Sequence, residues 1–295
     1  MRYTLRQLEV FLAIAQAGNL TRAANQLNMS QSAASSALKD IESQFDILVF
    51  DRIGKRLQLN EQGRQLRPMA EALMAMAEDL EQSLLQHAIA GPLNIGATLS
   101  IGNYLAVQMV ADYMAENPGS QVSLDVENTE HIVEKVLNYQ LDMGMIEGEF
   151  HHPDLIVEPW RTDELTVFCH PDHPLARSQQ DLSADDLVSI QWILREAGSG
   201  TRQAFDRAMH GLLPKLNIIL ELQHTEAIKR AVEAQLGVGC LSLITLEDEF
   251  KRGDLVRLNT PGINLNRQLY LILHKQKHRS AGIQSWLNLC DKWSA

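Results

Sequence analysis

The chain has 295 residues, 45% of them hydrophobic and 21% charged, which is ordinary for a globular protein with more than one core. No stretch approaches the roughly 20 apolar residues of a membrane-spanning helix, and the N-terminus lacks the apolar core of a secretory signal. We therefore expect a cytoplasmic protein with no membrane partner. The three cysteines lie far apart and form no C-x-x-C pair, which disfavours a disulfide framework or a zinc site (Cys169, Cys240 and Cys290).

The formal net charge of −11 argues against a nucleic-acid partner, but the charge is unevenly distributed. Residues 1–67 contain nine Lys/Arg and six Asp/Glu, a net charge of +3. This leaves seventeen basic and thirty-one acidic residues, a net charge of −14, for residues 68–295. A small basic N-terminal part, which we call the head, is thus followed by a large acidic body, and only the head suits the phosphates of DNA.

Three helices are predicted in the head. Apolar residues recur at steps of three and four between Leu5 and Ala15, which predicts an amphipathic helix that ends near Gly18. Asn19 or Thr21 can cap a second helix, and Ser30 can cap a third over residues 31–45. The third helix has an apolar face at i, i+4, i+7 and i+11, made by Ala34, Leu38, Ile41 and Phe45.

The N-terminal face of the third helix carries short polar side chains, as a recognition helix in the major groove requires. A short strand pattern follows around Gly54, and it predicts a wing whose cations contact phosphate or enter the minor groove. We therefore predict a DNA-binding domain over residues 1–61, with a helical hairpin that has a solvated polar face as the alternative. The predicted DNA-contacting residues are Thr21, Arg22, Ser30, Gln31, Ser32, Ser35, Ser36, Lys39, Arg52, Lys55 and Arg56.

The spacing of apolar residues in 62–90, at alternating steps of three and four, predicts one long helix. Its narrow apolar seam is made by Leu66, Met69, Leu73, Met76 and Leu80. Such a seam needs a partner, which is either a second copy of the chain or the head itself. Because proline is tolerated near a helix start, we expect this helix to begin close to Pro68.

The body, residues 91–295, alternates strand and helix patterns, which predicts a parallel sheet with crossover helices. The first unit includes a helix that Thr129 would cap. A second unit of the same kind follows, and the chain returns to the first at the end. We therefore predict two α/β lobes, with residues 91–162 and 267–295 in the first and residues 163–266 in the second, and crossovers near Thr162 and Asn266.

Two helix starts in the body can hold an anion, after the strands at "GATLSIGNY" and "EAGSGTR". Free N–H groups and the helix dipole attract negative charge, glycines allow close approach, and hydroxyls complete the coordination. A third start lies at "HTEAIK". The predicted ligand-contacting residues are Thr98, Ser100, Asn103, Glu147, Arg195, Gly198, Ser199, Gly200, Thr201, His224 and Thr225. For Thr98, Ser199 and Thr201, an ordinary N-cap is the alternative, and for Arg195 a salt bridge.

Residues 5–63 resemble the winged helix-turn-helix of LysR-type transcriptional regulators. The resemblance depends on Leu8, Phe11, Ala23, Ala24, Leu27, the segment "SQSAASSALKDIE" and the segment "VFDR". Leu20 and Asn60 depart from the family's pattern. The resemblance implies double-stranded promoter DNA as a partner, an antiparallel linker-helix dimer, dimers paired into a tetramer, and RNA polymerase as a further partner.

The body resembles the periplasmic-binding-protein-like effector domain of the same family. The segments "IGNYL", "IEG", "GSGTR" and "TEAIK" are similar to the sulfur-related subgroup that includes the YeiE and CysL types. This similarity implies that the small-molecule anion is a sulfur oxyanion such as sulfite or sulfate, with a small organic acid as the alternative. Glu147 would repel a dianion unless it is protonated or paired.

An enzyme and a solute-binding protein are the rival classes. The sequence lacks a G-x-S-x-G elbow, a Walker A loop and a well-placed G-x-G-x-x-G, and its paired histidines lack a further ligand at metal spacing. A solute-binding protein would need a signal peptide and no head. We therefore predict a regulator without enzymatic activity, metal or cofactor.

Overall fold

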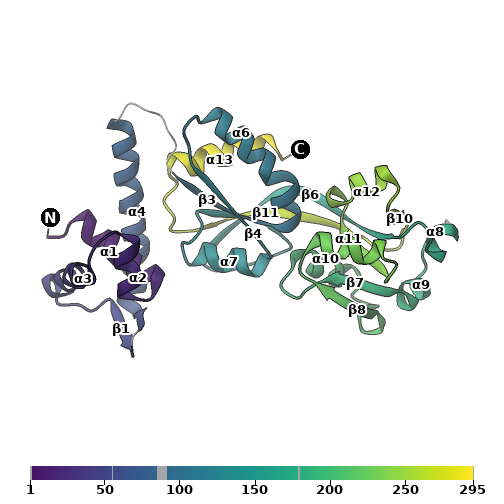
Figure 1. Cartoon of the computed structure of the whole chain (residues 1–295), viewed down its shortest axis with the longest axis horizontal. Coiled ribbons are helices and arrows are strands. Elements are labelled where there is room, and N and C mark those ends of the chain that lie inside the picture. Colours follow the sequence, from purple (N-terminus) through teal and green to yellow (C-terminus); the bar gives the residue numbers. More distant parts are fainter. Residues whose placement is uncertain (1, 55, 85–91, 179, 295) are drawn as a thin grey trace.

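The computed structural model describes residues 2–54, 56–84, 92–178 and 180–294 of the chain. Figure 1 shows the head at one end, a long helix beside it, and an elongated α/β body. Lys55 and the end of the predicted linker, residues 85–90, lie outside the described residues.

The head contains three helices and a two-stranded hairpin: α1 (Leu5–Ala17), α2 (Leu20–Gln26), α3 (Gln31–Phe45), β1 (Phe50–Ile53) and β2 (Arg56–Leu59). Asn19 caps α2 by accepting from the N–H groups of Thr21 and Arg22, and Ser30 caps α3. The hairpin packs on the helices through Phe50, whose ring centroid lies 5.6 Å from that of Phe11. These elements form the predicted helix-turn-helix and wing.

The long helix α4 (Glu61–Leu84) begins seven residues before the predicted start at Pro68, so that prediction was wrong. The side chain of Asn60 accepts from the N–H of Gly63, which sets the helix start. A Cβ on Gly63 would lie 2.1 Å from the carbonyl oxygen of Val49, so the first turn packs directly on the head. Pro68 stands inside the helix, where it has no N–H to donate to the Arg64 carbonyl.

The body is built on a nine-stranded mixed sheet with helices on its faces (Figure 1). We call the part containing β3, β4 and β5 the first lobe, and the part containing β7, β8 and β9 the second lobe. The first lobe contains β3 (Leu93–Thr98), α5 (Leu99–Ile101), a π-helical turn (Gly102–Ala106), α6 (Val107–Glu116), β4 (Val122–Glu127), α7 (Thr129–Leu137), β5 (Met143–Glu147) and α13 (Ala281–Lys292). The second contains α8 (Pro174–Ser178), α9 (Ala184–Ser189), β7 (Gln191–Arg195), α10 (Gly200–Ala208), a short 3-10 helix (Leu213–Lys215), β8 (Asn217–Leu222), α11 (Thr225–Glu233), β9 (Val238–Ser242), a second 3-10 helix (Leu243–Thr245), α12 (Glu247–Arg252) and β10 (Val256–Leu258).

Two long strands, β6 (Leu155–Cys169) and β11 (Asn266–His274), run through both lobes as an antiparallel pair. The strand order is β4-β3-β5-β11-β6-β9-β7-β8, with β10 also paired to β6. Within each lobe the pairs β3–β4, β3–β5, β7–β8 and β7–β9 are parallel, as strand–helix alternation predicts. The predicted crossovers near Thr162 and Asn266 lie on β6 and β11, where Asn266 pairs with Glu164.

Each lobe has its own apolar core. Tyr113 and Trp286 pack with ring centroids 5.5 Å apart in the first lobe, and Trp192 and Phe205 pack at 5.0 Å in the second. Among the described residues, no helix has both the length and the apolar composition needed to cross a membrane. The sheet therefore gives two separately packed lobes whose strand ends meet where β5, β6 and β11 adjoin.

Candidate functional site

The predicted DNA face is a polar concave surface in the head. A hollow of about 390 Å³ is lined by the start of α2, the start of α3 and the wing, including Thr21, Gln31, Ser35, Arg52 and Arg56. The remaining predicted contact residues within the described part of the head are exposed side chains: Arg22, Ser30, Ser32, Ser36 and Lys39. The fold thus brings α3, the predicted recognition helix, and the wing to one surface.

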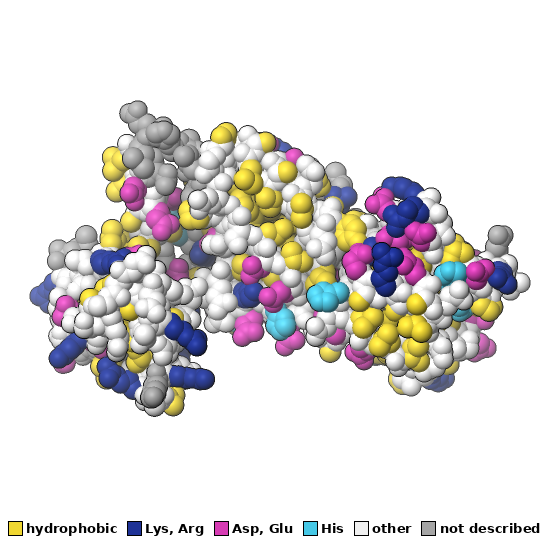
Figure 2. Space-filling model, viewed as in Figure 1, with side chains coloured by type: hydrophobic (Ala, Val, Ile, Leu, Met, Phe, Trp, Pro, Cys, Tyr) yellow, Lys and Arg dark blue, Asp and Glu magenta, His cyan; other side chains and the backbone are white. Residues whose placement is uncertain are grey.

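Charge on this surface is positive. Figure 2 shows Lys and Arg side chains projecting around the head, whereas Asp and Glu side chains are frequent on the viewed face of the body. Ser30 is also structural, because its hydroxyl accepts from the Ala33 N–H at 3.1 Å as the cap of α3. Ser32 is free of that role and lies 3.0 Å from the Ser30 hydroxyl.

The second candidate site lies between the lobes and is centred on Glu147, the last residue of β5. Its carboxylate is buried and accepts from groups on both lobes. One oxygen, Oε1, accepts from the Ser100 N–H at 3.0 Å. The other, Oε2, accepts from the Thr201 hydroxyl at 2.6 Å and from Arg267 Nη1 at 2.8 Å.

Arg267 links Glu147 to a second buried carboxylate. Its guanidinium also contacts Asp163 Oδ2 at 2.7 Å and donates to the Thr201 hydroxyl at 3.0 Å. The Ser242 hydroxyl donates to Asp163 at 2.9 Å. Strands β5, β6, β9 and β11 and the starts of α5 and α10 therefore meet in one buried polar network.

The electrostatics of this network favour a charged Glu147. Burial by itself would raise the pKa of the Glu147 carboxyl, but the Arg267 charge and the hydrogen bonds from Thr201 and Ser100 outweigh it and lower the pKa to about 2. For Arg267, burial opposes the charged form, yet Glu147 and Asp163 raise its pKa. The site thus holds a paired anion and cation. Glu147 is paired, which is one of the two conditions under which it would not repel an anionic ligand.

Close backbone contact fixes the start of α10 against β5. A Cβ on Gly200 would lie 2.0 Å from the Glu147 carbonyl oxygen, so only glycine allows this approach. The same carbonyl accepts from the Thr129 hydroxyl at 2.9 Å. The prediction that Thr129 caps α7 was therefore wrong. The cap is Asn128, whose side chain accepts from the His131 N–H.

Two predicted ligand residues are buried with unpaired hydroxyls. Thr98 and Thr225 are 2% and 1% exposed, and neither hydroxyl has a hydrogen-bond partner among the described residues. Thr98 is the last residue of β3 and directly precedes α5, and Thr225 is the first residue of α11, after the end of β8. Unpaired buried hydroxyls are costly and rare, so these two call for a ligand atom or a water.

The other predicted ligand residues are placed less directly. Ser199 caps α10 by accepting from the Arg202 N–H, which is the N-cap alternative. Arg195 is buried and pairs with Glu196, the salt-bridge alternative, although its charge also lowers the pKa of Glu147. Three residues at the helix starts are exposed: Asn103, Gly198 and His224.

Sequence reasoning missed Arg267, Asp163 and a second buried contact made by Lys229. The Lys229 ammonium donates to Tyr104 at 2.9 Å and to Glu249 at 2.9 Å, which joins α11 to the π-helical turn of the first lobe. Its hydrogen bonds to Glu226, Tyr104 and Glu249 raise its pKa although burial opposes the charge. The sequence did contain one signal that could have identified these residues. It is a charged residue beside an apolar run, such as Arg267 at the start of a buried strand.

Comparison with known proteins agrees with this architecture. Residues 5–64 match the family described as bacterial regulatory helix-turn-helix protein, lysR family, and residues 86–295 match the LysR substrate binding domain. The chain is 42% identical over 291 residues to the uncharacterized HTH-type transcriptional regulator YeiE of Escherichia coli strain K12, covering 99% of this chain and 98% of that protein. The predicted resemblance to the YeiE type is confirmed.

Two solved structures share the fold. A full-length OxyR variant from Pseudomonas aeruginosa aligns with a TM-score of 0.74 at 20% identity, covering 98% of this chain and 95% of that one. The regulatory domain of Synechocystis PCC6803 CcmR, solved in complex with 2-PG, aligns with a TM-score of 0.64 at 28% identity, covering 69% of this chain and 97% of that one. With both family regions present in order, this chain belongs to the LysR family of DNA-binding transcriptional regulators, with an N-terminal helix-turn-helix and an effector-binding domain.

Proposed function

We propose that the chain is a cytoplasmic regulator whose interlobe site binds a small anion, a sulfur oxyanion such as sulfite or sulfate, and thereby alters its binding to promoter DNA. The observation that supports this proposal is the donor set around Glu147. A backbone N–H at one helix start, a hydroxyl at another and a buried guanidinium already converge on one anionic group. These are the groups that bind oxyanions in proteins.

The unpaired hydroxyls of Thr98 and Thr225 supply further donors for a ligand. Because Glu147 is charged and paired, an anion entering this site either displaces its carboxylate or presents a proton to it. In this proposal the lobes can be arranged with or without the Glu147 carboxylate in its present position, and the ligand binds these two arrangements with different affinity. An effector needs such a difference in affinity to shift the equilibrium between two arrangements. The 2-PG complex of the CcmR regulatory domain is a precedent for a small molecule in this domain type.

Thermal unfolding of the full chain with sulfite, sulfate, thiosulfate, phosphate and small aromatic acids tests the proposal. An anion at one hundred times its Kd would add about 2.7 kcal/mol to the stability of the native state. A shift with a sulfur oxyanion supports the sulfur assignment. A shift only with an organic acid would replace it by the organic-acid alternative, and no shift with any anion would refute the anion site.

Thr98→Val provides the sharpest variant. Its hydroxyl has no partner in the described part of the ligand-free chain, so removing it should leave unliganded stability unchanged or slightly higher while weakening the anion-induced shift. Thr166→Val is the matched control, because Thr166 is also buried with an unpaired hydroxyl among the described residues but lies within β6 and not at the start of α5 or α11. Equal effects of the two variants would count against a role of Thr98 in binding.

The head residues are proposed to act on DNA in a dimer. An apolar groove of about 670 Å³ runs along α1, α3 and α4, and Met69, which lines it, is 70% exposed. The seam continues to Met76 and Leu80, which are 51% and 60% exposed. A second copy of α4 would cover this groove, and two paired heads would read two half-sites.

In this proposal two dimers form a tetramer on the promoter, where RNA polymerase is the further partner. Sedimentation of the Met69→Glu variant tests the dimer, with Glu81→Gln on the same helix as the control. Met69→Glu should shift the chain toward monomer. A variant that keeps the wild-type sedimentation coefficient would contradict pairing through this groove.

A further inference from the structure

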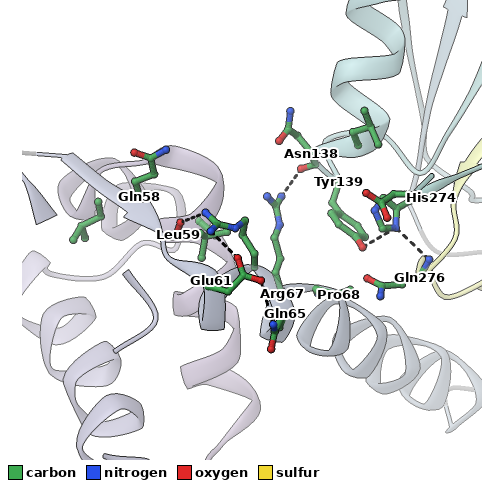
Figure 3. A pocket seen from close by; sticks show the side chains of 15 residues that line it. Gln58, Leu59, Glu61, Gln65, Arg67, Pro68, Asn138, Tyr139, His274 and Gln276 are labelled. Carbon is green, nitrogen blue, oxygen red and sulfur yellow. Dashed lines mark hydrogen bonds and ion pairs between the residues drawn. The ribbon is translucent and has the colours of Figure 1, made fainter. Parts of the chain in front are cut away.

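Arg67 of α4 contacts the first lobe where α7 ends. Its guanidinium carbon lies 5.1 Å from the centroid of the Tyr139 ring, a cation–π distance. Its Nη2 donates to the carbonyl of Asn138, which lies at the C-terminal end of the α7 helix. Figure 3 shows Arg67 reaching from α4 toward Asn138 and Tyr139. The helix that carries the head is therefore docked on the effector domain by Arg67, in a socket of main-chain and aromatic groups, and farther along α4 by the contact between Asp79 and His278 Nε2 at 3.1 Å.

Two cavities flank this contact. One of about 550 Å³ lies toward the wing and the start of α4, and another of about 540 Å³ lies along α1 and the middle of α4. Both are lined by Arg67 and Tyr139. The contact is thus a pillar between two open spaces, and a head that tilts about it has to break the contact between Asp79 and His278.

The positive charge of Arg67 in this pillar is only partly compensated by neighbouring groups. Burial lowers the pKa of Arg67, while Glu71 and Tyr139 oppose that shift. Glu71 lies 3.7 Å from Arg67 Nε, and that nitrogen has no hydrogen-bond partner within the described ranges. A half-buried cation held this way gains little net stability, so docked and released arrangements can lie close in free energy.

Tyr139 connects the pillar to the strand that serves the interlobe site. Its hydroxyl lies 2.8 Å from His274 Nδ1, and the two rings are 4.4 Å apart. His274 ends β11, and Arg267 is the second residue of the same strand. One end of β11 therefore lies in the Glu147 network, and the other lies beneath the ring on which Arg67 rests.

We propose that the Arg67–Tyr139 contact is the pivot through which the effector domain sets the orientation of its own DNA-binding head. Arg67 and Tyr139 are positioning residues that touch neither DNA nor effector. In the docked state the first lobe holds α4 at a fixed angle, and in the released state the head tilts into the flanking cavities. The inference does not depend on which anion binds between the lobes.

Spin-label distances within the full chain test the pivot directly. The native thiols Cys169, Cys240 and Cys290 are buried, so cysteines introduced by Ser43→Cys on α3 and Ala115→Cys on α6 can be labelled selectively. Labelled chain diluted with unlabelled chain reports the distance within one protomer. We expect one dominant distance in the parent protein.

Arg67→Ala and Tyr139→Ala should broaden this distribution equally, and the double variant should be no broader than either. Tyr139→Phe keeps the ring and should keep the narrow distribution. Arg64→Ala is the matched control, since Arg64 lines the same cavity but bonds to Glu61 and Leu59 within the head and the start of α4. An unchanged distribution in Arg67→Ala, or equal broadening in Arg64→Ala, would overturn the pivot.

A second readout separates the pivot from ordinary structural support. On an operator selected from random DNA, Arg67→Ala should bind a single half-site with parental affinity but lose the parental bend angle, measured by energy transfer between the DNA ends. Loss of half-site affinity together with the bend would indicate a damaged head and overturn the assignment. If sulfite stabilises neither the parent nor the variant, the proposed effector fails while the distance measurement still decides the pivot.

Discussion

Glu147 and Arg267 form a buried ion pair, with Arg267 Nη1 2.8 Å from Glu147 Oε2 and both side chains at most 2% exposed. They are 120 residues apart in the chain and become neighbours because β11 pairs with β5. The pair joins the end of a first-lobe strand to the start of a strand that returns from the second lobe. The stability of the lobe junction and the proposed binding of an anion therefore depend on the same two side chains.

Removing the cation should destabilise the body strongly. Arg267→Met would leave the carboxylates of Glu147 and Asp163 buried without their shared partner, at a cost of about 3–5 kcal/mol. Urea unfolding followed by tryptophan fluorescence measures this loss. Arg257→Ala is the control, because that exposed ion pair with Glu164 should contribute only about 0–1 kcal/mol. Similar urea midpoints for both variants would contradict a contribution of the buried Arg267 ion pairs to the stability of the body.

The pH dependence of stability should carry the signature of Glu147. Its pKa in the folded chain, about 2, lies below the unfolded value of 4.5, so the charged carboxylate stabilises the native state above about pH 4.5. That contribution, about 3 kcal/mol, is lost as the pH falls from 4.5 toward 2. The difference in unfolding free energy between parent and Glu147→Gln should therefore shrink over this range. A constant difference from pH 7 to pH 2 would show that folding does not shift the pKa of the Glu147 carboxyl.

A methyl group at Gly200 should separate α10 from β5. The added Cβ would lie 2.0 Å from the Glu147 carbonyl oxygen and 2.7 Å from the Glu147 Cβ, and overpacking of this kind costs about 1–3 kcal/mol. Gly200→Ala should also remove the Thr201 bond to Glu147 by moving the helix start. Gly211→Ala is the matched control, because a Cβ there meets nothing within 4 Å. Chemical denaturation compares the two, and equal stability would refute the close approach.

Head residues that contact phosphate should be separable from those that read bases. Arg56→Ala should weaken binding to all sequences and reduce the slope of log K against log salt by about 1. Ser32→Glu, at the start of α3, should abolish specific binding with the fold intact. Fluorescence anisotropy with selected and scrambled operators at several salt concentrations makes the distinction. If Ser32→Glu still binds the selected operator more tightly than the scrambled one, as the parent does, the recognition-helix assignment is contradicted.

Local signals predicted the elements well where one residue decides the outcome. Ser30 and Asn19 sit directly before their helices, and the side-chain caps observed there are local interactions that a sequence displays. Pro68 misled because the start of α4 is set by tertiary contact, through Asn60 and the close approach of Gly63 to Val49, and not by local preference. Thr129 misled for the same reason, since its hydroxyl bonds to a different strand.

The centre of the interlobe site could be predicted only in part. Thr201 and Ser100 were found because helix starts after strands display their donors in the sequence. Arg267 was not found, because its pairing with Glu147 depends on the register of β11 against β5, which no local pattern encodes. Two charges at the termini of apolar strands were the remaining clue, because each needs a buried partner: one ends the strand in "MIEG", and the other lies at the start of the strand in "NRQLYLIL".

The π-helical turn at Gly102–Ala106 divides one continuous helix into two functional parts. Before the turn, Ser100 points its N–H at Glu147, and after it Met109 and Tyr113 pack in the first-lobe core. A π-turn holds about one residue more than the α-turn it replaces, so the two faces are set independently. The extra residue therefore determines how Ser100 faces Glu147 relative to the packed side chains of Met109 and Tyr113.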